Sequence, residues 1–252
     1  MNRIPASVTV SVLLCFFNTT TEGQTSTLPT WEVGISAGPF IYQGDLAPGA
    51  LGSYKTMRPG LSVYGNRILS NSFALRTSLT VAGLAGDDLK YPGAAWRQER
   101  ALNFRTSVFE VSETLVWDLL GNNGNHYNSR FSPYLFGGIG YSFLHVRRDA
   151  SKFNSTYFGT ESTVTNGLAS DLAHNIPRGI PVLPMGAGVR YSLSPALSLT
   201  AETSYRLTFT DYLDGFSKVA NPSKNDHYYN FSIGVVYTFF KSKAMKCPKN
   251  PR

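Results

Sequence analysis

Residues 197–210 alternate strictly in side-chain character, and this alternation limits what the chain can fold into. Every second position is apolar or weakly polar, while the positions between them are polar and include Glu202 and Arg206. Successive side chains of a β-strand point to opposite faces, so the segment is predicted to be a strand with one apolar and one polar face. Such a strand fits a soluble sandwich, or an outer-membrane barrel whose apolar face contacts lipid.

Seven further segments alternate in the same way. The eight predicted strands lie within residues 31–45, 61–66, 73–86, 106–119, 135–143, 183–193, 197–210 and 229–239. The connections after the first, third, fifth and seventh strands are long, and the others are short or moderate. Outer-membrane barrels show this parity, because their periplasmic turns are short and their extracellular loops are long. The sequence therefore predicts an all-β protein, an eight-stranded antiparallel transmembrane β-barrel of the outer-membrane type.

One residue departs from the alternation. Glu113 falls on the apolar side of the predicted strand at 106–119. A β-bulge would explain it, and so would local pairing with a neighbouring strand. The sequence leaves both explanations open.

Composition excludes several classes of function. The net charge of +7 comes from Lys and Arg residues that are scattered rather than clustered, apart from the C-terminal segment, so we expect no nucleic-acid binding. No apolar run reaches the roughly 20 residues that a membrane helix requires. There is no Gly-rich phosphate loop and no Cys/His set with metal-ligand spacing, so we expect no cofactor, no metal and no small-molecule substrate.

The chain divides into three parts. Residues 1–23 resemble a signal peptide, with Arg3, an apolar core at 8–17 and a cleavage site between Gly23 and Gln24. Residues 24–240 form the predicted barrel, which contacts outer-membrane lipids, and residues 241–252 form a basic tail. Both ends of the mature chain are expected in the periplasm.

The polar faces of the strands supply charges of both signs to the interior. An eight-stranded barrel has an interior just wide enough for side chains to fill it. We expect a lumen closed by a salt-bridge network; a proton or ion path through Glu202 and Arg206 is the functional alternative. The inward-facing charged residues are Glu32, Glu110, Glu202, Arg76, Arg190 and Arg206.

One set of residues suggests chemistry. Asp87 and Asp88 end one predicted strand, and Asp226 and His227 begin another, all on the predicted extracellular rim. Omptin proteases resemble this in placing paired acids opposite an Asp and a His, where they could activate water. The omptin barrel needs ten strands, whereas eight are predicted here, so the protein is expected not to be an enzyme.

The tail is the predicted partner contact. Five positive charges and no negative ones follow the last strand, and Cys247 is the only cysteine left after signal cleavage, so no internal disulfide can form. The tail could dock a periplasmic partner, with Cys247 available for an intermolecular disulfide. Alternatively, it lies near anionic lipid headgroups. The proposed contact residues are Lys241, Lys243, Lys246, Cys247 and Lys249.

Several blocks resemble the PorG family of the type IX secretion system of Bacteroidetes. They are Trp31-Glu32-Val33-Gly34, Tyr42-Gln43-Gly44-Asp45-Leu46, Asn103-Phe104-Arg105, Pro133-Tyr134-Leu135-Phe136-Gly137-Gly138-Ile139-Gly140, Phe209-Thr210-Asp211-Tyr212-Leu213-Asp214 and the Cys247-Pro248-Lys249 ending. The resemblance implies a non-enzymatic component that anchors a periplasmic ring of PorK lipoprotein and PorN to the outer membrane. The alternative is a surface adhesin or ligand-binding barrel that uses the long loop at 147–181.

Overall fold

A computed structural model describes residues 31–123, 130–220 and 225–239. The predicted signal peptide and the tail, with Lys241, Lys243, Lys246, Cys247 and Lys249, lie outside the described residues.

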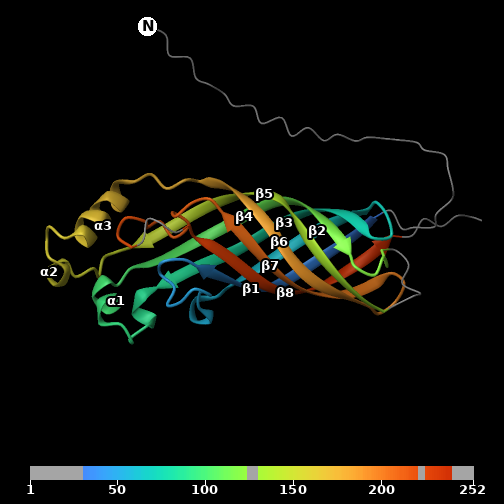
Figure 1. Cartoon of the computed structure of the whole chain (residues 1–252), viewed down its shortest axis with the longest axis horizontal. Coiled ribbons are helices and arrows are strands. Elements are labelled where there is room, and N and C mark those ends of the chain that lie inside the picture. Colours follow the sequence, from blue (N-terminus) through green and yellow to red (C-terminus); the bar gives the residue numbers. More distant parts are fainter. Residues whose placement is uncertain (1–30, 124–129, 221–224, 240–252) are drawn as a thin grey trace, which may run out of the picture.

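The described chain forms a closed antiparallel β-barrel in which each strand pairs with its neighbours in sequence and β8 pairs with β1 (Figure 1). Closure leaves no strand edge unpaired, which is what a lipid environment demands of a sheet. The prediction of an eight-stranded antiparallel barrel is confirmed. Its strands are β1 (Trp31–Gln43), β2 (Arg58–Ile68), β3 (Phe73–Asp87), β4 (Asn103–Asp118), β5 (Phe131–Asp149), β6 (Gly179–Ser192), β7 (Leu197–Thr208) and β8 (His227–Phe239).

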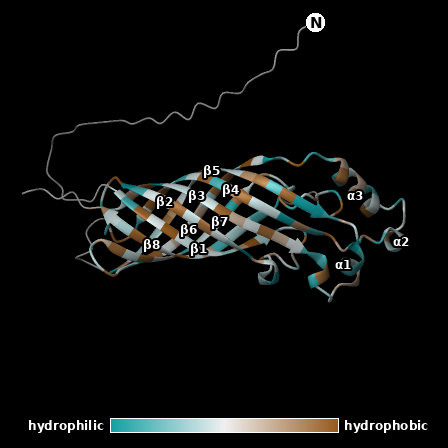
Figure 2. Cartoon of the chain, turned by 180° about the vertical axis from the view of Figure 1, so that it is seen from behind, coloured by the Kyte–Doolittle hydropathy of each residue, from teal (hydrophilic) through white to brown (hydrophobic). Residues whose placement is uncertain are grey.

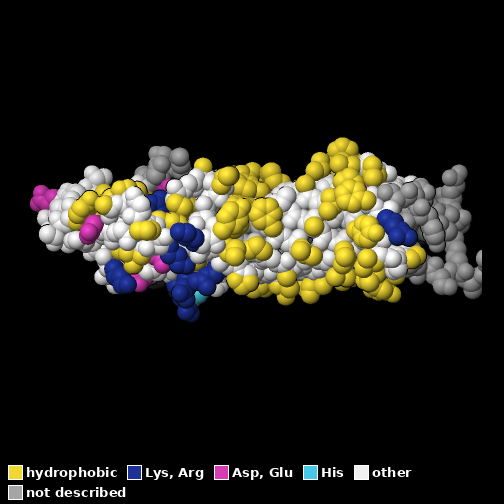
Figure 3. Space-filling model, turned by 90° about the horizontal axis from the view of Figure 1, so that it is seen from below, with side chains coloured by type: hydrophobic (Ala, Val, Ile, Leu, Met, Phe, Trp, Pro, Cys, Tyr) yellow, Lys and Arg dark blue, Asp and Glu magenta, His cyan; other side chains and the backbone are white. Residues whose placement is uncertain are grey.

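The alternation on β7 matches the two faces of the barrel wall. Leu197 and Leu199 are exposed on the outside, whereas Thr200 and Arg206 are buried inside. The other strands follow the same pattern: hydrophobic and hydrophilic residues alternate along them (Figure 2), and hydrophobic side chains cover the barrel wall in the view of Figure 3. Exposed apolar side chains from all eight strands therefore form a band around the barrel. An apolar outer band on a closed barrel is the surface of a transmembrane barrel.

The register around Glu113 decides between the two explanations for this residue. β3 and β4 pair without interruption through Thr77 and Glu113, so no bulge is present. The Thr77 hydroxyl donates a hydrogen bond of 2.7 Å to the Glu113 carboxylate on the outer face. Pairing with the neighbouring strand therefore explains why an acidic residue sits in the apolar register.

The two ends of the barrel differ. Segments 69–72, 119–130 and 193–196 connect strands at one end, which we call the turn end. Segments 44–57, 88–102, 150–178 and 209–226 connect them at the other, the loop end. The loop end also carries the helices η1 (Tyr54–Thr56), η2 (Asp88–Lys90), α1 (Ala95–Arg100), α2 (Ser155–Phe158) and α3 (Thr163–Ala173). None of the described helices is long and apolar enough to cross a membrane.

The predicted long loop at 147–181 is present as the connection 150–178, and it contains two helices that the sequence did not indicate. β5 continues to Asp149, β6 begins at Gly179, and α2 and α3 lie between them. These helices begin at side-chain caps, because Asn154 accepts from the Tyr157 amide and Ser162 accepts from the Thr165 amide. Their short length and weak apolar periodicity hide them in the sequence.

The lumen is apolar at the loop end, a feature that the predicted salt-bridge network does not include. Side chains from the strand ends and from the loops meet there in one core. Its largest members are Phe40, Tyr42, Leu46, Leu84, Leu102, Phe104, Leu213, Phe216 and Tyr228. The loop end is thus a folded cap that closes the barrel.

Candidate functional site

The first level of the polar lumen, at the turn end, is built on β1 and β6. Arg190 makes a two-pronged ion pair with Glu32, with both N–O distances at 2.9 Å. Glu32 also accepts hydrogen bonds from the Asn66 amide at 2.8 Å and from the Thr238 hydroxyl at 3.3 Å. A buried pair of this geometry, with its remaining lone pairs satisfied, offsets much of the cost of removing two charges from water.

The second ion pair lies close to the first and is linked to it. Arg76 Nη1 lies 2.7 Å from Glu202 Oε1, and Arg76 Nε donates to the Asn66 carbonyl oxygen at 3.0 Å. The Tyr134 hydroxyl donates to the same Glu202 oxygen. The Arg76 guanidinium also stacks 4.3 Å from the centre of the Tyr64 ring, which adds a cation–π contact.

The third ion pair lies nearer the cap. Arg206 Nε is 3.4 Å from Glu110 Oε2, and the Tyr228 hydroxyl donates to that oxygen at 2.8 Å. Arg206 also donates to the side-chain carbonyl of Asn230. The six lumen residues singled out in the sequence are thus brought together as three pairs of one acid and one base, and Asn66 links the first two pairs.

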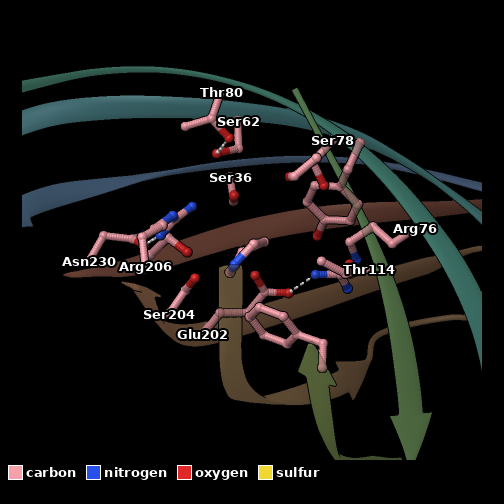
Figure 4. A pocket seen from close by; sticks show the side chains of 15 residues that line it. Ser36, Ser62, Arg76, Ser78, Thr80, Thr114, Glu202, Ser204, Arg206 and Asn230 are labelled. Atoms are coloured by element: carbon pink, nitrogen blue, oxygen red, sulfur yellow. Dashed lines mark hydrogen bonds and ion pairs between the residues drawn. The ribbon is translucent and has the colours of Figure 1, made fainter. Parts of the chain in front are cut away.

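A small cavity is lined by the Arg76–Glu202 pair on one side and by Arg206 and Asn230 on the other (Figure 4). Its volume is about 40 Å³, and hydroxyl groups of Ser and Thr residues line much of it, with a 2.8 Å hydrogen bond between Ser62 and Thr80. A cavity of this size holds about three water molecules. The arrangement supports a closed lumen.

The cap holds a cluster of buried acids that strand alternation does not reveal. The Tyr42 hydroxyl lies 2.7 Å from Asp214 Oδ2 and 2.6 Å from Asp226 Oδ1. The other oxygens of these acids accept amide hydrogens, Asp214 from Phe216 at 2.8 Å and Asp226 from Leu213 at 3.1 Å. A hydroxyl has one proton, so it can donate to only one of two carboxylates. One of the two acids must therefore carry a proton and donate it to Tyr42.

The electrostatics of the cap agree with this count of protons. Burial raises the pKa of Asp214 to about 8, and burial with the charge of Asp214 raises the pKa of Asp226 well above its usual value. Burial also raises the pKa of Asp211 to about 6. In the sequence, this cluster is marked only by Tyr42, at an inward position near the end of a strand. Its two partners come from the connection 209–226, which shows no period, so the sequence alone does not reveal the cluster.

The residues that resembled a protease site do not form one. Asp88 is fully buried and binds Arg100, at 2.7 and 2.9 Å, and Arg97, at 3.4 Å. Asp87 caps η2 by accepting from the Leu89 amide. Asp226 is committed to Tyr42, and no hydrogen bond or ion pair among the described residues joins Asp88 to Asp226 or His227. Within the same residues, no group of acids, histidines and cysteines could hold a metal ion.

Solved structures of outer-membrane proteins are similar to this chain. Neisserial surface protein A (NspA) is 13% identical and has a TM-score of 0.46, with 85% of this chain and all of that chain covered. Ail of Yersinia pestis, in complex with the heparin analogue sucrose octasulfate, is 13% identical with a TM-score of 0.44 and coverage of 83% and 97%. OprG of Pseudomonas aeruginosa is 10% identical with a TM-score of 0.42 and coverage of 86% and 99%.

No curated protein matches the chain. A family model matches residues 8–244, which include every described strand. The chain therefore belongs to the family described as a domain of unknown function, DUF6089.

Proposed function

We propose that this protein is a non-enzymatic outer-membrane barrel that anchors a periplasmic protein assembly, the PorK/PorN-type ring of a type IX secretion machine. The observation that carries the proposal is the filled lumen. Three ion pairs and an apolar cap occupy the interior, so the barrel offers a membrane-embedded scaffold in place of a channel.

The identity of the machine rests on the resemblance to the PorG family, and the cap supports it. Three of the resembling blocks, 42–46, 103–105 and 209–214, meet there. Tyr42 packs edge-on against Phe104 at 4.7 Å and binds Asp214. Leu46 and Leu213 are fully buried in the same core. Blocks far apart in the sequence thus build one structural unit, which gives a physical reason for their occurring together.

The partner contacts in this proposal come from the turn end and from residues 241–252, with both chain ends in the periplasm. We expect affinity-tagged barrel to co-purify with the ring subunits from membranes. Deletion of 241–252 should reduce the recovery of these subunits, and crosslinking through Cys247 should join the barrel to one of them. A Cys247→Ser chain is the matched control for the crosslink. Recovery of no ring subunit, together with normal secretion after the deletion, would refute the anchoring role.

A surface adhesin is the second candidate. The observation that favours it is a pair of exposed apolar side chains at the loop end, Tyr157 on α2 (54% exposed) and Leu172 on α3 (51%). Replacing 155–161 with a Gly-Ser linker removes α2 and leaves α3 in place. Loss of adhesion with intact secretion would support the adhesin over the anchor.

A further inference from the structure

We propose that a basic patch on the outer wall of β4 and β5, extended by the residue before β6, binds the phosphate groups of a phosphorylated glycolipid, of the lipid A type, in the outer leaflet. The patch consists of Arg105, His145, Arg147 and Arg178. The proposal rests on the membrane orientation proposed above, with the loop end outside the cell.

The two central arginines face each other across neighbouring strands. Arg105 on β4 pairs in register with Arg147 on β5, and both side chains are exposed. Like charges directly opposite one another in a sheet are destabilising. Among the described residues, no ion pair joins either arginine to a carboxylate. An anion bound between the two guanidinium groups would relieve this repulsion.

A nearby acid is already engaged. Asp149 follows two residues after Arg147 and pairs in register with Asn103. Its oxygens accept hydrogen bonds from the Asn103 side chain at 3.2 Å and from the Ser151 amide at 2.9 Å. These bonds hold Asp149 beyond the patch, on the side away from the apolar band.

His145 supplies a further donor. Arg147 Nε donates to His145 Nε2 at 3.2 Å. A ring nitrogen that accepts a hydrogen bond leaves the ring proton on the other nitrogen, Nδ1, which can then donate to a ligand. Together with two guanidinium forks, this gives the multiple donors that a phosphate prefers.

The depth of the patch matches that of lipid headgroups. From the Arg105–Arg147 pair toward the middle of the barrel, the next pairs of outward-facing residues are Ser107–His145 and Phe109–Phe143. The two phenylalanine rings are stacked and belong to the exposed apolar band. Four residues of strand span about 13 Å, and a tilt of about 40° reduces this to roughly 10 Å along the barrel axis. Arginine can direct its charged end toward the headgroups from this position. Figure 3 shows Lys and Arg side chains gathered between the hydrophobic band and the loop end, with a His side chain beside them.

A hollow lies at the edge of the patch, next to His145 and Arg178. It has a volume of about 430 Å³ and is lined mainly by segment 174–178 and by inward-facing residues of β5, so Arg105 and Arg147 lie outside it. Arg148 also lines it, but its guanidinium donates to the backbone carbonyls of Asp171, Leu172, His174 and Gly215. These bonds join β5 to the end of α3 and to segment 209–226. The Arg178 backbone is fixed against β5, because its carbonyl accepts from the Leu144 amide at 2.8 Å. The side chain of Arg178 is exposed, and no hydrogen bond or ion pair joins it to another of the described residues.

Native mass spectrometry of the purified full-length barrel in detergent tests the proposal. Diphosphorylated lipid A, monophosphorylated lipid A and phosphatidylglycerol are added separately, and the lipid-bound fraction is measured. We expect diphosphorylated lipid A to be retained best, and the Arg105→Gln/Arg147→Gln variant to weaken its retention at least about tenfold. Arg67→Gln is the matched control, because Arg67 is an exposed outward arginine at the turn end that should not contribute. Heat-modifiable migration on gels verifies that each variant is folded.

Two outcomes would overturn the assignment. Equal retention of lipid A by the double variant and the native barrel would remove the patch as the binding site. Equal retention of phosphatidylglycerol and lipid A by the native barrel would remove the phosphorylated glycolipid as the ligand. Labelling of a Ser151→Cys chain on intact cells reports the orientation separately, so a failure of the patch can be told apart from a failure of the proposed orientation.

Discussion

At the scale of single residues, the cap depends on a shared proton. The Tyr42 hydroxyl lies within hydrogen-bond distance of both Asp214 and Asp226, and its single proton cannot satisfy both carboxyls. Asp45 and Asp211 add negative charge around the cluster and favour the protonated form. The cap therefore uses an uncharged carboxyl to join the end of β1 to the segment 209–226.

This cluster makes the stability of the cap depend on pH. An acid whose folded pKa is raised binds more protons in the folded state, so its contribution to folding falls as the pH rises through the window between its unfolded and folded values. For Asp214 that window runs from about 4 to about 8. The free energy of opening of the cap can be measured from the hydrogen exchange of its amides, corrected for intrinsic rates. We expect this free energy to fall by up to about 1.4 kcal/mol per pH unit within that window.

The Asp214→Asn variant tests the origin of this dependence. An asparagine amide can donate to Tyr42 without titrating, so most of the slope should disappear while the cap stays closed. A slope that is unchanged in this variant would contradict the assignment to the Tyr42–Asp214–Asp226 cluster.

At the scale of elements, α3 is tied to the cap by one carboxylate. Asp171 is fully buried and accepts the amide hydrogens of Ser217, Lys218 and Val219 at 2.9 to 3.0 Å. Leu168, one turn earlier, packs in the apolar core. The helix thus fixes residues 217–219 within segment 209–226, and these bonds join the two longest connections.

Removal of this carboxylate should release the helix from the barrel. In Asp171→Ala two buried amides and one part-buried amide lose their acceptor, at a cost on the order of 3 kcal/mol, which increases local opening roughly 100-fold. We expect faster proteolytic cleavage within 150–178 and unchanged heat-modifiable migration of the barrel. Asp149→Ala, which removes an exposed carboxylate nearby, is the control and should be cleaved at the native rate. Equal resistance of the two variants would show that Asp171 does not hold the helix.

The strands could be predicted from the sequence and the cap could not. Period-two alternation is a local property, so it located the faces of β7 and of the other strands, and it placed Glu32, Arg76 and Arg190 in the interior. The pairing of each arginine with a particular acid depends on barrel closure. Closure pairs β1 with β8 and places Glu32 on β1 across the lumen from Arg190 on β6. The cap is harder still, because inward residues such as Leu84 and Phe104 are apolar, and their partners come from loops that have no period.

At the scale of the whole molecule, the barrel is closed at successive levels along its axis. The Glu32–Arg190 and Arg76–Glu202 pairs close the turn end, the Glu110–Arg206 pair closes the middle, and the apolar core closes the loop end. Each level is formed by side chains from different strands. Opening a path for ions would therefore require the loss of several unrelated contacts at once.

This arrangement predicts the electrical behaviour of the barrel. In planar lipid bilayers the native protein should show no steady open channel, because every level blocks the path. The Arg76→Ser/Glu202→Ser variant should also stay closed, since the Glu110–Arg206 pair and the cap remain in place. An open porin inserted under the same conditions serves as the positive control. A stable ohmic current through the native barrel would contradict the filled lumen and, with it, the observation on which the anchoring role rests.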